Sequence, residues 1–212
     1  MALKIYEIFH SLQGETSRIG LPTVFVRLTG CPMRCTYCDT AYAFNGGSNM
    51  EIADIMQQVA SFGAHYVTVT GGEPLAQKEC RDLLQALCDA GYSVSIETGG
   101  AMDISVVDPR VSVILDIKTP ASNESENNRW GNLAYLKAAD EVKFVLCNRA
   151  DYDWAKQKVQ ELKLNEKCPI LFSPSYHELA ATELAGWVLE DRLPVRMQVQ
   201  LHKVLWGEKP GV

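Results

Sequence analysis

The sequence predicts an α/β protein built as an incomplete TIM-like (β/α) barrel, with parallel strands around a polar interior and helices outside. Short β-rich segments alternate with helical patterns along the chain, which is typical of βα units and a parallel sheet. Several of these strands are apolar on one face only, whereas ordinary parallel strands are apolar on both. At 212 residues the chain has the length of one domain, so we expect a single domain over residues 1–212.

The expected elements follow one another in a regular order. Runs rich in Val, Ile, Thr and Phe predict strands at residues 23–30, 66–71, 92–98, 112–118, 141–147, 169–175 and 195–201. Apolar residues at helical spacing predict helices near 51–62, 76–90, 149–164 and 177–191. The stretch 121–132 is the most polar of the chain and is expected to be a surface loop.

The two faces of the expected strands differ in polarity. In the first strand Val24, Val26 and Leu28 share one face, and Phe25, Arg27 and Thr29 share the other. The same alternation recurs in four later strands. The apolar faces carry Val67 and Val69; Val94 and Ile96; Val113, Leu115 and Ile117; and Val195, Met197, Val199 and Leu201. The opposite faces of these strands carry, in the same order, Thr68 and Thr70; Ser93, Ser95 and Glu97; Ile114, Asp116 and Lys118; and Arg196, Gln198, Gln200 and His202. A flat antiparallel sheet gives the same pattern, but the intervening helices disfavour it. Because a closed barrel fills its interior with bulky aliphatic side chains, a polar interior indicates an incomplete barrel that holds a ligand.

Composition excludes several classes of protein. No apolar run approaches the roughly 20 residues of a membrane helix, and the start MALKIYEIFH lacks the pattern of a secretory signal. We therefore expect a cytoplasmic protein with no membrane partner. The net charge of −6 argues against a nucleic-acid partner, because binding to the phosphate backbone needs a basic face.

Three of the seven cysteines form a cluster in the sequence. Core packing is the expected role of Cys80 and Cys88 on an apolar helical stripe and of Cys147 and Cys168 beside apolar strands. Cys31, Cys35 and Cys38 instead lie on a loop directly after the first strand, where βα enzymes build their active sites. Their spacing lets a short loop present three thiolates to a 4Fe–4S cluster. A structural zinc site needs four ligands, so the alternative is a zinc knuckle completed by a distant residue.

The cysteine loop resembles the signature of the radical S-adenosylmethionine (SAM) superfamily, which has an aromatic residue before the third cysteine, here Tyr37. The segment Thr70-Gly71-Gly72-Glu73-Pro74 resembles the GGEP motif of that superfamily. The resemblance implies an open iron that binds SAM, and one-electron cleavage of SAM to a radical that abstracts hydrogen from the substrate. It implies a set of cofactor-binding residues: Tyr37, Cys38, Asp39, Gly71, Gly72, Glu73, Glu97, Asp116, Lys118 and Gln200. No further catalytic side chain is implied.

Three other segments resemble the 7-carboxy-7-deazaguanine synthase family of this superfamily. They are IYEIFHSLQGETSRIGLPTVFVRLTGC, CDT after the cluster and QLHK near the end, and the resemblance spans about residues 4–203. It implies a barrel of about six parallel strands. It also implies conversion of 6-carboxy-5,6,7,8-tetrahydropterin to 7-carboxy-7-deazaguanine with loss of ammonia, on the route to queuosine. The family adds Mg²⁺ at a threonine equivalent to Thr40; the simpler alternative for Thr40 is a turn hydroxyl bonded to backbone.

The resemblance also implies the substrate contacts and the partners. The pterin contacts are Leu12, Gln13, Gly14, Glu15, Arg27, Thr70 and His202. The alternatives are an ion pair with Glu97 for Arg27, and an edge-strand histidine for His202. A flavodoxin or ferredoxin as electron donor and a homodimer are also implied. The chain departs from family members that end near the His-Lys pair, because it continues beyond Lys203 through WGEKPGV. The alternative functions are a glycyl-radical-enzyme activase and a non-catalytic zinc-binding module.

Overall fold

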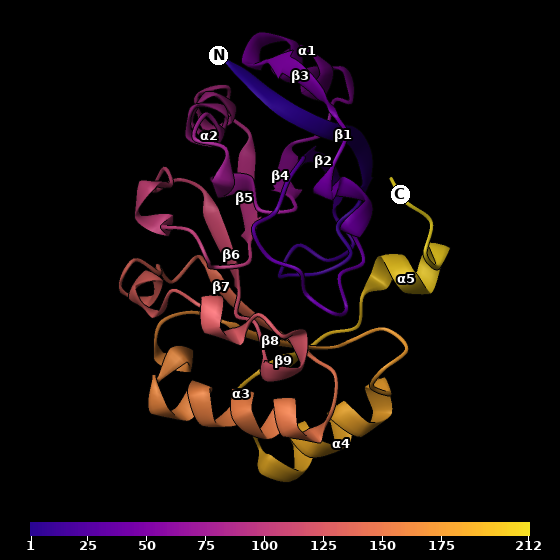
Figure 1. The fold of residues 1–212 in the computed structure, drawn as a ribbon, viewed down its shortest axis with the longest axis vertical. Coiled ribbons are helices and arrows are strands. Elements are labelled where there is room, and N and C mark those ends of the chain that lie inside the picture. Colours follow the sequence, from indigo (N-terminus) through magenta and orange to yellow (C-terminus); the bar gives the residue numbers. More distant parts are fainter.

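The computed structural model describes residues 1–212 and contains one curved sheet of nine strands, in the order β3-β1-β2-β4-β5-β6-β7-β8-β9 (Figure 1). The strands are β1 (Ala2–Leu12), β2 (Pro22–Leu28), β3 (Ser48–Glu51), β4 (Tyr66–Gly71), β5 (Ser93–Thr98), β6 (Ser112–Asp116), β7 (Glu141–Leu146), β8 (Ile170–Pro174) and β9 (Arg196–Met197). The α-helices are α1 (Ile52–Ser61), α2 (Cys80–Asp89), α3 (Arg149–Glu161), α4 (Ala181–Asp191) and α5 (Leu201–Trp206). β2 and β4 to β9 are parallel to one another, while β1 and β3 are antiparallel additions at one edge. The predicted incomplete barrel is confirmed.

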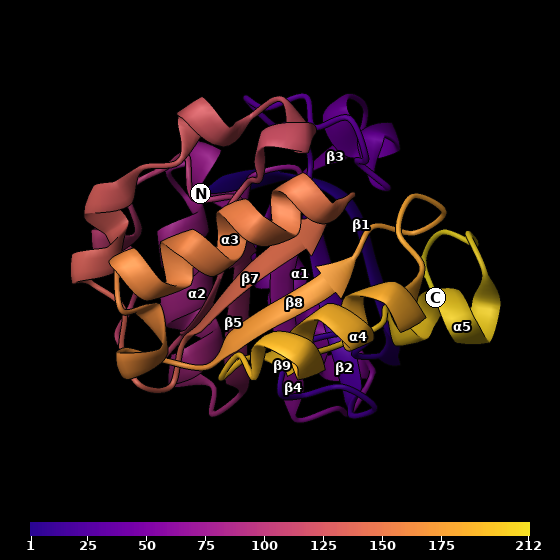
Figure 2. The same ribbon diagram turned by 90° about the horizontal axis from the view of Figure 1, so that it is seen from below.

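The apolar faces of the strands form the core under the outer helices. Val24, Val69 and Ile96 belong to one cluster of 35 buried residues that also contains Ile55 of α1 and Leu83 of α2. In Figure 2, α3 and α4 cover the part of the sheet formed by β7 and β8. The polar faces of the same strands point to the inner side. The alternation therefore predicted correctly which side chains enter the barrel.

The N-terminal strand was not among the predicted elements, and of the first 15 residues only Leu12 to Glu15 were interpreted, as substrate contacts. β1 pairs with β2 over most of its length, with Phe9 opposite Phe25. Their rings stack with centroids 5.0 Å apart on the inner side of the sheet. β1 thus adds an antiparallel wall to the barrel, and the predicted substrate segment begins where this strand ends.

The predicted strand at 195–201 is largely wrong, since β9 contains only Arg196 and Met197. The chain leaves the sheet because its next residues bond to the segment after β1. The Gln198 side chain bonds to both backbone groups of Thr16, at 2.9 and 2.7 Å, and the Leu201 amide donates to the Gly14 carbonyl at 2.9 Å. His202 therefore lies on α5 and not on an edge strand.

The polar stretch at 121–132 has no α-helix. It forms short 3₁₀ turns at Pro120–Ser122, Ser125–Asn127 and Trp130–Ala134, between β6 and β7. None of the helices in the structure combines the length and the apolar character needed to cross a bilayer.

Candidate active site

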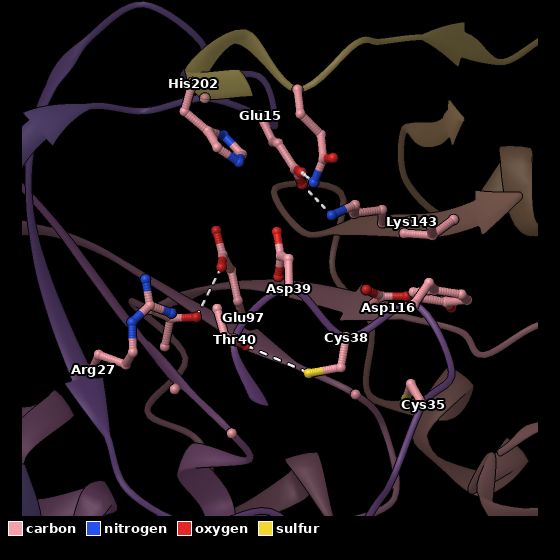
Figure 3. Close-up of a pocket in the computed structure, with 18 of the residues that line it drawn as sticks. Glu15, Arg27, Cys35, Cys38, Asp39, Thr40, Glu97, Asp116, Lys143 and His202 are labelled. Atoms are coloured by element: carbon pink, nitrogen blue, oxygen red, sulfur yellow. Dashed lines mark hydrogen bonds and ion pairs between the residues drawn. The ribbon is translucent and has the colours of Figure 1, made fainter. Parts of the chain in front are cut away.

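One cavity of about 370 Å³ lies at the carboxyl ends of the parallel strands. The sequence-predicted residues that line it are Leu12, Gln13, Gly14, Glu15, Arg27, Cys31, Cys35, Tyr37, Cys38, Asp39, Thr40, Thr70, Gly71, Gly72, Glu97, Asp116, Lys118, Gln200 and His202. Glu73 is the one predicted site residue that does not line it. In the view of Figure 3, Glu15 and His202 lie above, Cys35 and Cys38 lie below, and Glu97 and Asp116 lie between them.

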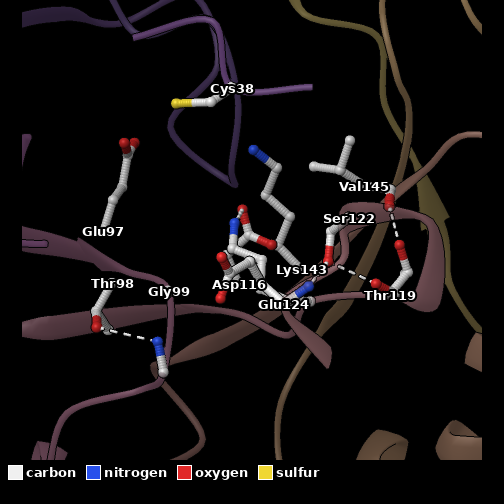
Figure 4. Close-up of polar contacts among 12 residues, drawn as sticks. Cys38, Glu97, Thr98, Gly99, Asp116, Thr119, Ser122, Glu124, Lys143 and Val145 are labelled. Carbon is white, nitrogen blue, oxygen red and sulfur yellow. Dashed lines mark hydrogen bonds and ion pairs between the residues drawn. The ribbon is translucent and has the colours of Figure 1, made fainter. Parts of the chain in front are cut away.

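The cysteine loop is braced by the loop that follows β6. The Thr36 amide donates to the Ser122 carbonyl at 3.2 Å, and the Thr36 hydroxyl donates to the Ala121 carbonyl at 2.8 Å. The Arg34 amide donates to a Glu124 carboxylate oxygen at 2.5 Å. In turn the Thr119 hydroxyl donates to the Val145 carbonyl at 3.1 Å, which ties this loop to β7 (Figure 4). The polar stretch is therefore a support for the cysteines.

The three cysteines suit a cluster better than a single metal ion. All three are free thiols that face the same cavity. The structure contains no group of three or more His, Cys, Asp or Glu side chains that could hold one metal ion. A zinc site needs four ligands around one ion, whereas a cubane takes one thiolate on each of three irons. The arrangement disfavours the zinc alternative.

The glycines of the GGEP segment bring its backbone against the cysteine loop. A Cβ atom on Gly72 would lie 2.2 Å from the Gly30 carbonyl oxygen and 2.7 Å from the Cys31 Cβ. The Glu73 amide donates to the Gly30 carbonyl at 2.8 Å. Only a residue without a side chain allows this approach at position 72.

Glu73 is oriented away from the cavity. Its carboxylate is fully buried and accepts from the Leu75 amide at 3.1 Å, the Thr98 hydroxyl at 2.9 Å and the Gly99 amide at 2.9 Å. Burial raises the pKa of this carboxyl. In this structure Glu73 holds the loop after β5, which differs from its expected role as a cofactor-binding residue.

Two buried polar atoms beside the cysteines lack a partner. They are the Tyr37 hydroxyl and the Asp116 Oδ1 atom, while Asp116 Oδ2 lies 3.1 Å from the Lys118 Nζ atom. The Lys118 ammonium also lies 5.8 Å from the centre of the Tyr37 ring. Burial lowers the pKa of Lys118, but Asp116, Tyr37 and Cys35 together outweigh it and the pKa is raised. Since buried polar atoms are normally satisfied, this part of the cavity fits a polar ligand such as SAM.

Glu15 is bonded to residues from far along the chain. Gln200 donates its side-chain amide to Glu15 Oε1 at 2.7 Å, and Lys143 forms an ion pair with Glu15 Oε2. Burial opposes ionisation of Glu15, but Lys143 and Gln200 outweigh it, so the pKa is lowered. Gln200, expected to bind the cofactor, is thus bonded to a predicted substrate residue.

Sequence reasoning missed Lys143, although its signal was present. Within 141–147, Val142 and Phe144 are in the core, so the period of two turns Lys143 and Val145 inward. The missed residue adds a basic group to the interior, where Arg27 and Lys118 were already predicted.

Glu97 is a partly buried carboxyl that forms no ion pair. Its oxygens accept from the Thr70 hydroxyl at 2.9 Å and from the Gln13 side-chain amide at 3.4 Å. Burial and the nearby Glu15 raise its pKa. Glu97, expected at the cofactor, is therefore bonded to two predicted substrate residues.

Arg27 forms its ion pair with Glu7 and not with Glu97, so the proposed Glu97 alternative is wrong. The Arg27 Nε atom lies 2.7 Å from Glu7 Oε1, which also accepts from the Tyr42 hydroxyl at 3.1 Å. Only Nε takes part in this pair. The terminal nitrogens of the guanidinium remain available in the cavity, and their geometry suits a ligand carboxylate.

The C-terminal segment closes the cavity on one side. A Cβ atom on Gly14 would lie 2.1 Å from the His202 Nδ1 atom, so the ring packs directly on the backbone at Gly14. Burial lowers the pKa of His202. The Lys203 Nζ atom lies 3.6 Å from the Asp39 Oδ2 atom. Glu208 and Val212, which follow α5, line the same cavity.

Thr40 lies on the cysteine loop next to the predicted cluster. Its hydroxyl lies 3.7 Å from the Cys38 sulfur and does not cap the 3₁₀ turn Ala41–Phe44. The side chain faces the cavity between the cysteines and Glu97 (Figure 3).

Comparison with known proteins gives consistent matches. Residues 25–116 match the model of the radical SAM superfamily. The 7-carboxy-7-deazaguanine synthase of Chlorobaculum tepidum is 48% identical, over 97% of this chain and 94% of that protein. That of Koribacter versatilis is 40% identical, over 99% of this chain and all of that protein. The crystal structure of QueE from Escherichia coli covers 95% of both chains with a TM-score of 0.78 and 23% identity, which supports the fold.

Proposed function

Because this chain belongs to the 7-carboxy-7-deazaguanine synthase family of the radical SAM superfamily, we propose that it converts 6-carboxy-5,6,7,8-tetrahydropterin to 7-carboxy-7-deazaguanine with release of ammonia. The observation that carries this proposal is a single cavity that joins three cysteine thiols to Gln13, Glu15, Arg27 and His202. One end suits an iron–sulfur cofactor, and the other suits a polar heterocycle with a carboxylate.

The proposed cofactors are a 4Fe–4S cluster on Cys31, Cys35 and Cys38 and a SAM molecule beside it. When bound, this pair supplies a carbon-centred radical that can abstract a hydrogen atom from the substrate. Tyr37, Gly72, Asp116 and Lys118 would hold the SAM molecule. Tyr37 and Asp116 carry the unsatisfied polar atoms near the cysteines, Lys118 pairs with Asp116, and Gly72 lies against Cys31.

The substrate contacts follow from the donors and acceptors that remain free. Arg27 would bind the pterin carboxylate through its terminal nitrogens. Glu15 would accept hydrogen bonds from the amide and amino edge of the ring, with Gln13, Thr70 and His202 completing the pocket. Leu12 and Gly14 would contact the ring through the backbone and an apolar side chain. These side chains orient the substrate and exclude water.

A magnesium site is proposed at Thr40. A single hydroxyl is a weak ligand, and Mg²⁺ commonly retains waters and takes further ligands from the substrate. The position of Thr40 between the cysteines and Glu97 supports a site shared with the substrate carboxylate. Binding of Mg²⁺ should therefore depend on the presence of the pterin.

The proposed cellular setting is that of the family: a cytoplasmic homodimer reduced by a flavodoxin or ferredoxin. The exposed apolar side chains Val204, Leu205 and Trp206 of α5 support a contact surface of this kind.

The test is anaerobic reconstitution with iron and sulfide, followed by incubation with SAM, reductant, Mg²⁺ and 6-carboxytetrahydropterin. The expected result is a visible iron–sulfur absorbance and formation of 7-carboxy-7-deazaguanine. Cleavage of SAM without any deazapurine would refute the substrate and retain the superfamily. Stoichiometric zinc with no iron would refute both.

A further inference from the structure

Lys143 is a buried basic side chain to which the proposed function gives no role. It comes from β7 and points inward, because its neighbours Val142 and Phe144 occupy the core. Its side chain is 12% exposed and lines the cavity. Its ion-pair partner is Glu15, whose side chain is 10% exposed.

The partners of Glu15 leave half of its acceptor capacity open. An ionised carboxylate offers about four acceptor positions on its two oxygens. One on Oε1 is taken by Gln200 and one on Oε2 by Lys143, so each oxygen retains one. Since Glu15 also lines the cavity, the two open positions suit a ligand that presents two neighbouring N–H groups.

The charge of Glu15 depends on Lys143. A buried carboxylate without a cation takes up a proton, because the interior disfavours an isolated charge. The nearby Glu97 carboxyl supplies no positive charge, and no other lysine or arginine forms an ion pair with Glu15. A protonated Glu15 would present an O–H donor to the ligand in place of one acceptor.

We propose that Lys143 is a positioning and specificity-determining residue, which fixes Glu15 as the acceptor for the two N–H groups of a 2-amino-4-oxopyrimidine ring. The inference rests on the proposed function, because a pterin contains such a ring. Its consequence is discrimination at the 2-position. A ring with a carbonyl oxygen there would place an acceptor against the Glu15 carboxylate, which is repulsive.

The experiment compares two unreactive ring analogues in the reconstituted full-length enzyme. 6-Carboxypterin carries the 2-amino group, and 6-carboxylumazine carries an oxygen in its place. We expect Lys143→Met to weaken 6-carboxypterin binding by about 10- to 100-fold, as for loss of a hydrogen bond to a charged group. Binding of 6-carboxylumazine should change by less than about 3-fold, and KM for the substrate should rise more than kcat falls.

Three further variants separate this role from a purely structural one. Lys143→Arg keeps the cation and should recover most of the selectivity. Glu15→Gln should lose selectivity as Lys143→Met does. The double variant Lys143→Met/Glu15→Gln removes both charges, so it folds without an unpaired buried carboxylate, and it should be no less selective than either single variant.

Two outcomes overturn the inference about Lys143. One is a Lys143→Met enzyme with wild-type selectivity between the analogues. The other is an equal loss of affinity for both analogues, together with lower iron content and melting temperature, which would indicate a structural role. If the wild-type enzyme converts the pterin and either outcome is seen, only this inference fails. A wild-type enzyme that neither binds 6-carboxypterin nor converts the substrate overturns the proposed function as well.

Discussion

The two ends of the cavity are held together in different ways. The cysteine region comprises residues 29–40 and the strand-end loops that brace it, at 71–74, 98–100 and 119–124. The Glu15 region comprises Gln13, Gly14, Glu15, Lys143, Gln200 and His202. In the first, the loop after β2 contacts the loops at the carboxyl ends of β4, β5 and β6, with bonds between residues up to 90 positions apart. In the second, the partners come from more distant parts of the chain, since Glu15 is 128 residues from Lys143 and 185 residues from Gln200.

The sheet therefore determines the position of the cysteine region, and bonds between distant residues determine the position of the Glu15 region. Carboxyl ends of parallel strands meet at one edge, so strand order brings the loops of the cysteine region together. The Glu15 region depends on individual long-range bonds. Damage to the cysteine region should therefore abolish all chemistry, and damage to the Glu15 region should affect the substrate and leave the cofactor intact.

The largest effect is expected from Cys35→Ala. Loss of one of three thiolates leaves two ligands for the cluster, so SAM cleavage and product formation should both become undetectable. Iron content and visible absorbance after reconstitution measure the effect. Cys88→Ala is the matched control, since Cys88 lies on α2 away from the cavity and should retain full iron content. A normal cluster in Cys35→Ala would contradict the assignment.

The next effect is expected from Gly14→Ala. The new Cβ would lie 2.1 Å from the His202 ring, so α5 or the segment 13–16 must shift. Overpacking of this kind costs about 1–3 kcal/mol, which predicts a rise in KM for the pterin of about 10- to 100-fold. SAM cleavage and iron content should stay normal.

Gly186→Ala provides the control for that substitution. No atom lies within 4 Å of the position of its Cβ, and Gly186 lies inside α4. Alanine there should stabilise the protein by about 0.5–1 kcal/mol and leave the kinetics unchanged. If Gly14→Ala removed the cluster as well, the two regions would not be separable.

A smaller effect is expected from Arg27→Lys. The ammonium keeps the charge beside Glu7 but cannot bind a carboxylate through two parallel N–H groups. We expect KM for the pterin to rise by about 10-fold with a smaller change in kcat. Steady-state kinetics at saturating SAM measure both. An unchanged KM would place the substrate carboxylate elsewhere in the cavity.

The smallest effect is a pH dependence of stability in which two carboxyls of the cavity act in opposite directions. Burial raises the folded-state pKa of Glu97, so its contribution is present below the ordinary glutamate pKa and is lost as pH rises through the folded value. Glu97→Gln should therefore raise Tm by a few degrees relative to wild type at pH 7, and this gain should disappear near pH 4.

The contribution of Glu15 to stability changes with pH in the opposite direction. Burial opposes its ionisation, but Lys143 and Gln200 outweigh burial and lower the folded-state pKa of Glu15. Its contribution is present above the ordinary glutamate pKa and is lost as pH falls through the folded value. Glu15→Gln should lower Tm at pH 7, and the loss should shrink on acidification. Thermal melts of the cofactor-free protein measure the Tm change of both variants. A Tm change of the same sign for Glu97→Gln and Glu15→Gln at pH 7 would contradict the assignment of Lys143 as the partner of Glu15.

The period of two in the strands predicted the fold and most of the cavity. It turned Arg27, Thr70, Glu97, Asp116 and Lys118 inward, and all five line the cavity. The hydrophobic period of the strands and the spacing of the motifs do not predict which side chains form ion pairs or hydrogen bonds with one another. Neither predicts that Arg27 pairs with Glu7, that Glu73 bonds to Gly99, or that Gln200 bonds to Glu15.

The errors have a common physical cause. Residues 195–201 have the alternation of a strand, but the side chain of Gln198 bonds to Thr16 and the chain leaves the sheet after Met197. The inward position of Lys143 follows from the alternation of its strand, but its pairing with Glu15, 128 residues away, does not. In both cases the sequence pattern does not predict a bond between segments far apart in the chain.

The bonds of Gln198 and Leu201 to the segment 14–16 have a consequence for synthesis of the protein. A ribosome releases the chain from its N-terminus, so the strands and the cysteine loop are available to fold well before residues 198–202 emerge. Until then Thr16 and Gly14 lack the partners that hold them across the opening. The nascent chain can thus shape the cysteine end of the cavity early, while the end that binds the pterin is completed only after residues 198–202 have been translated.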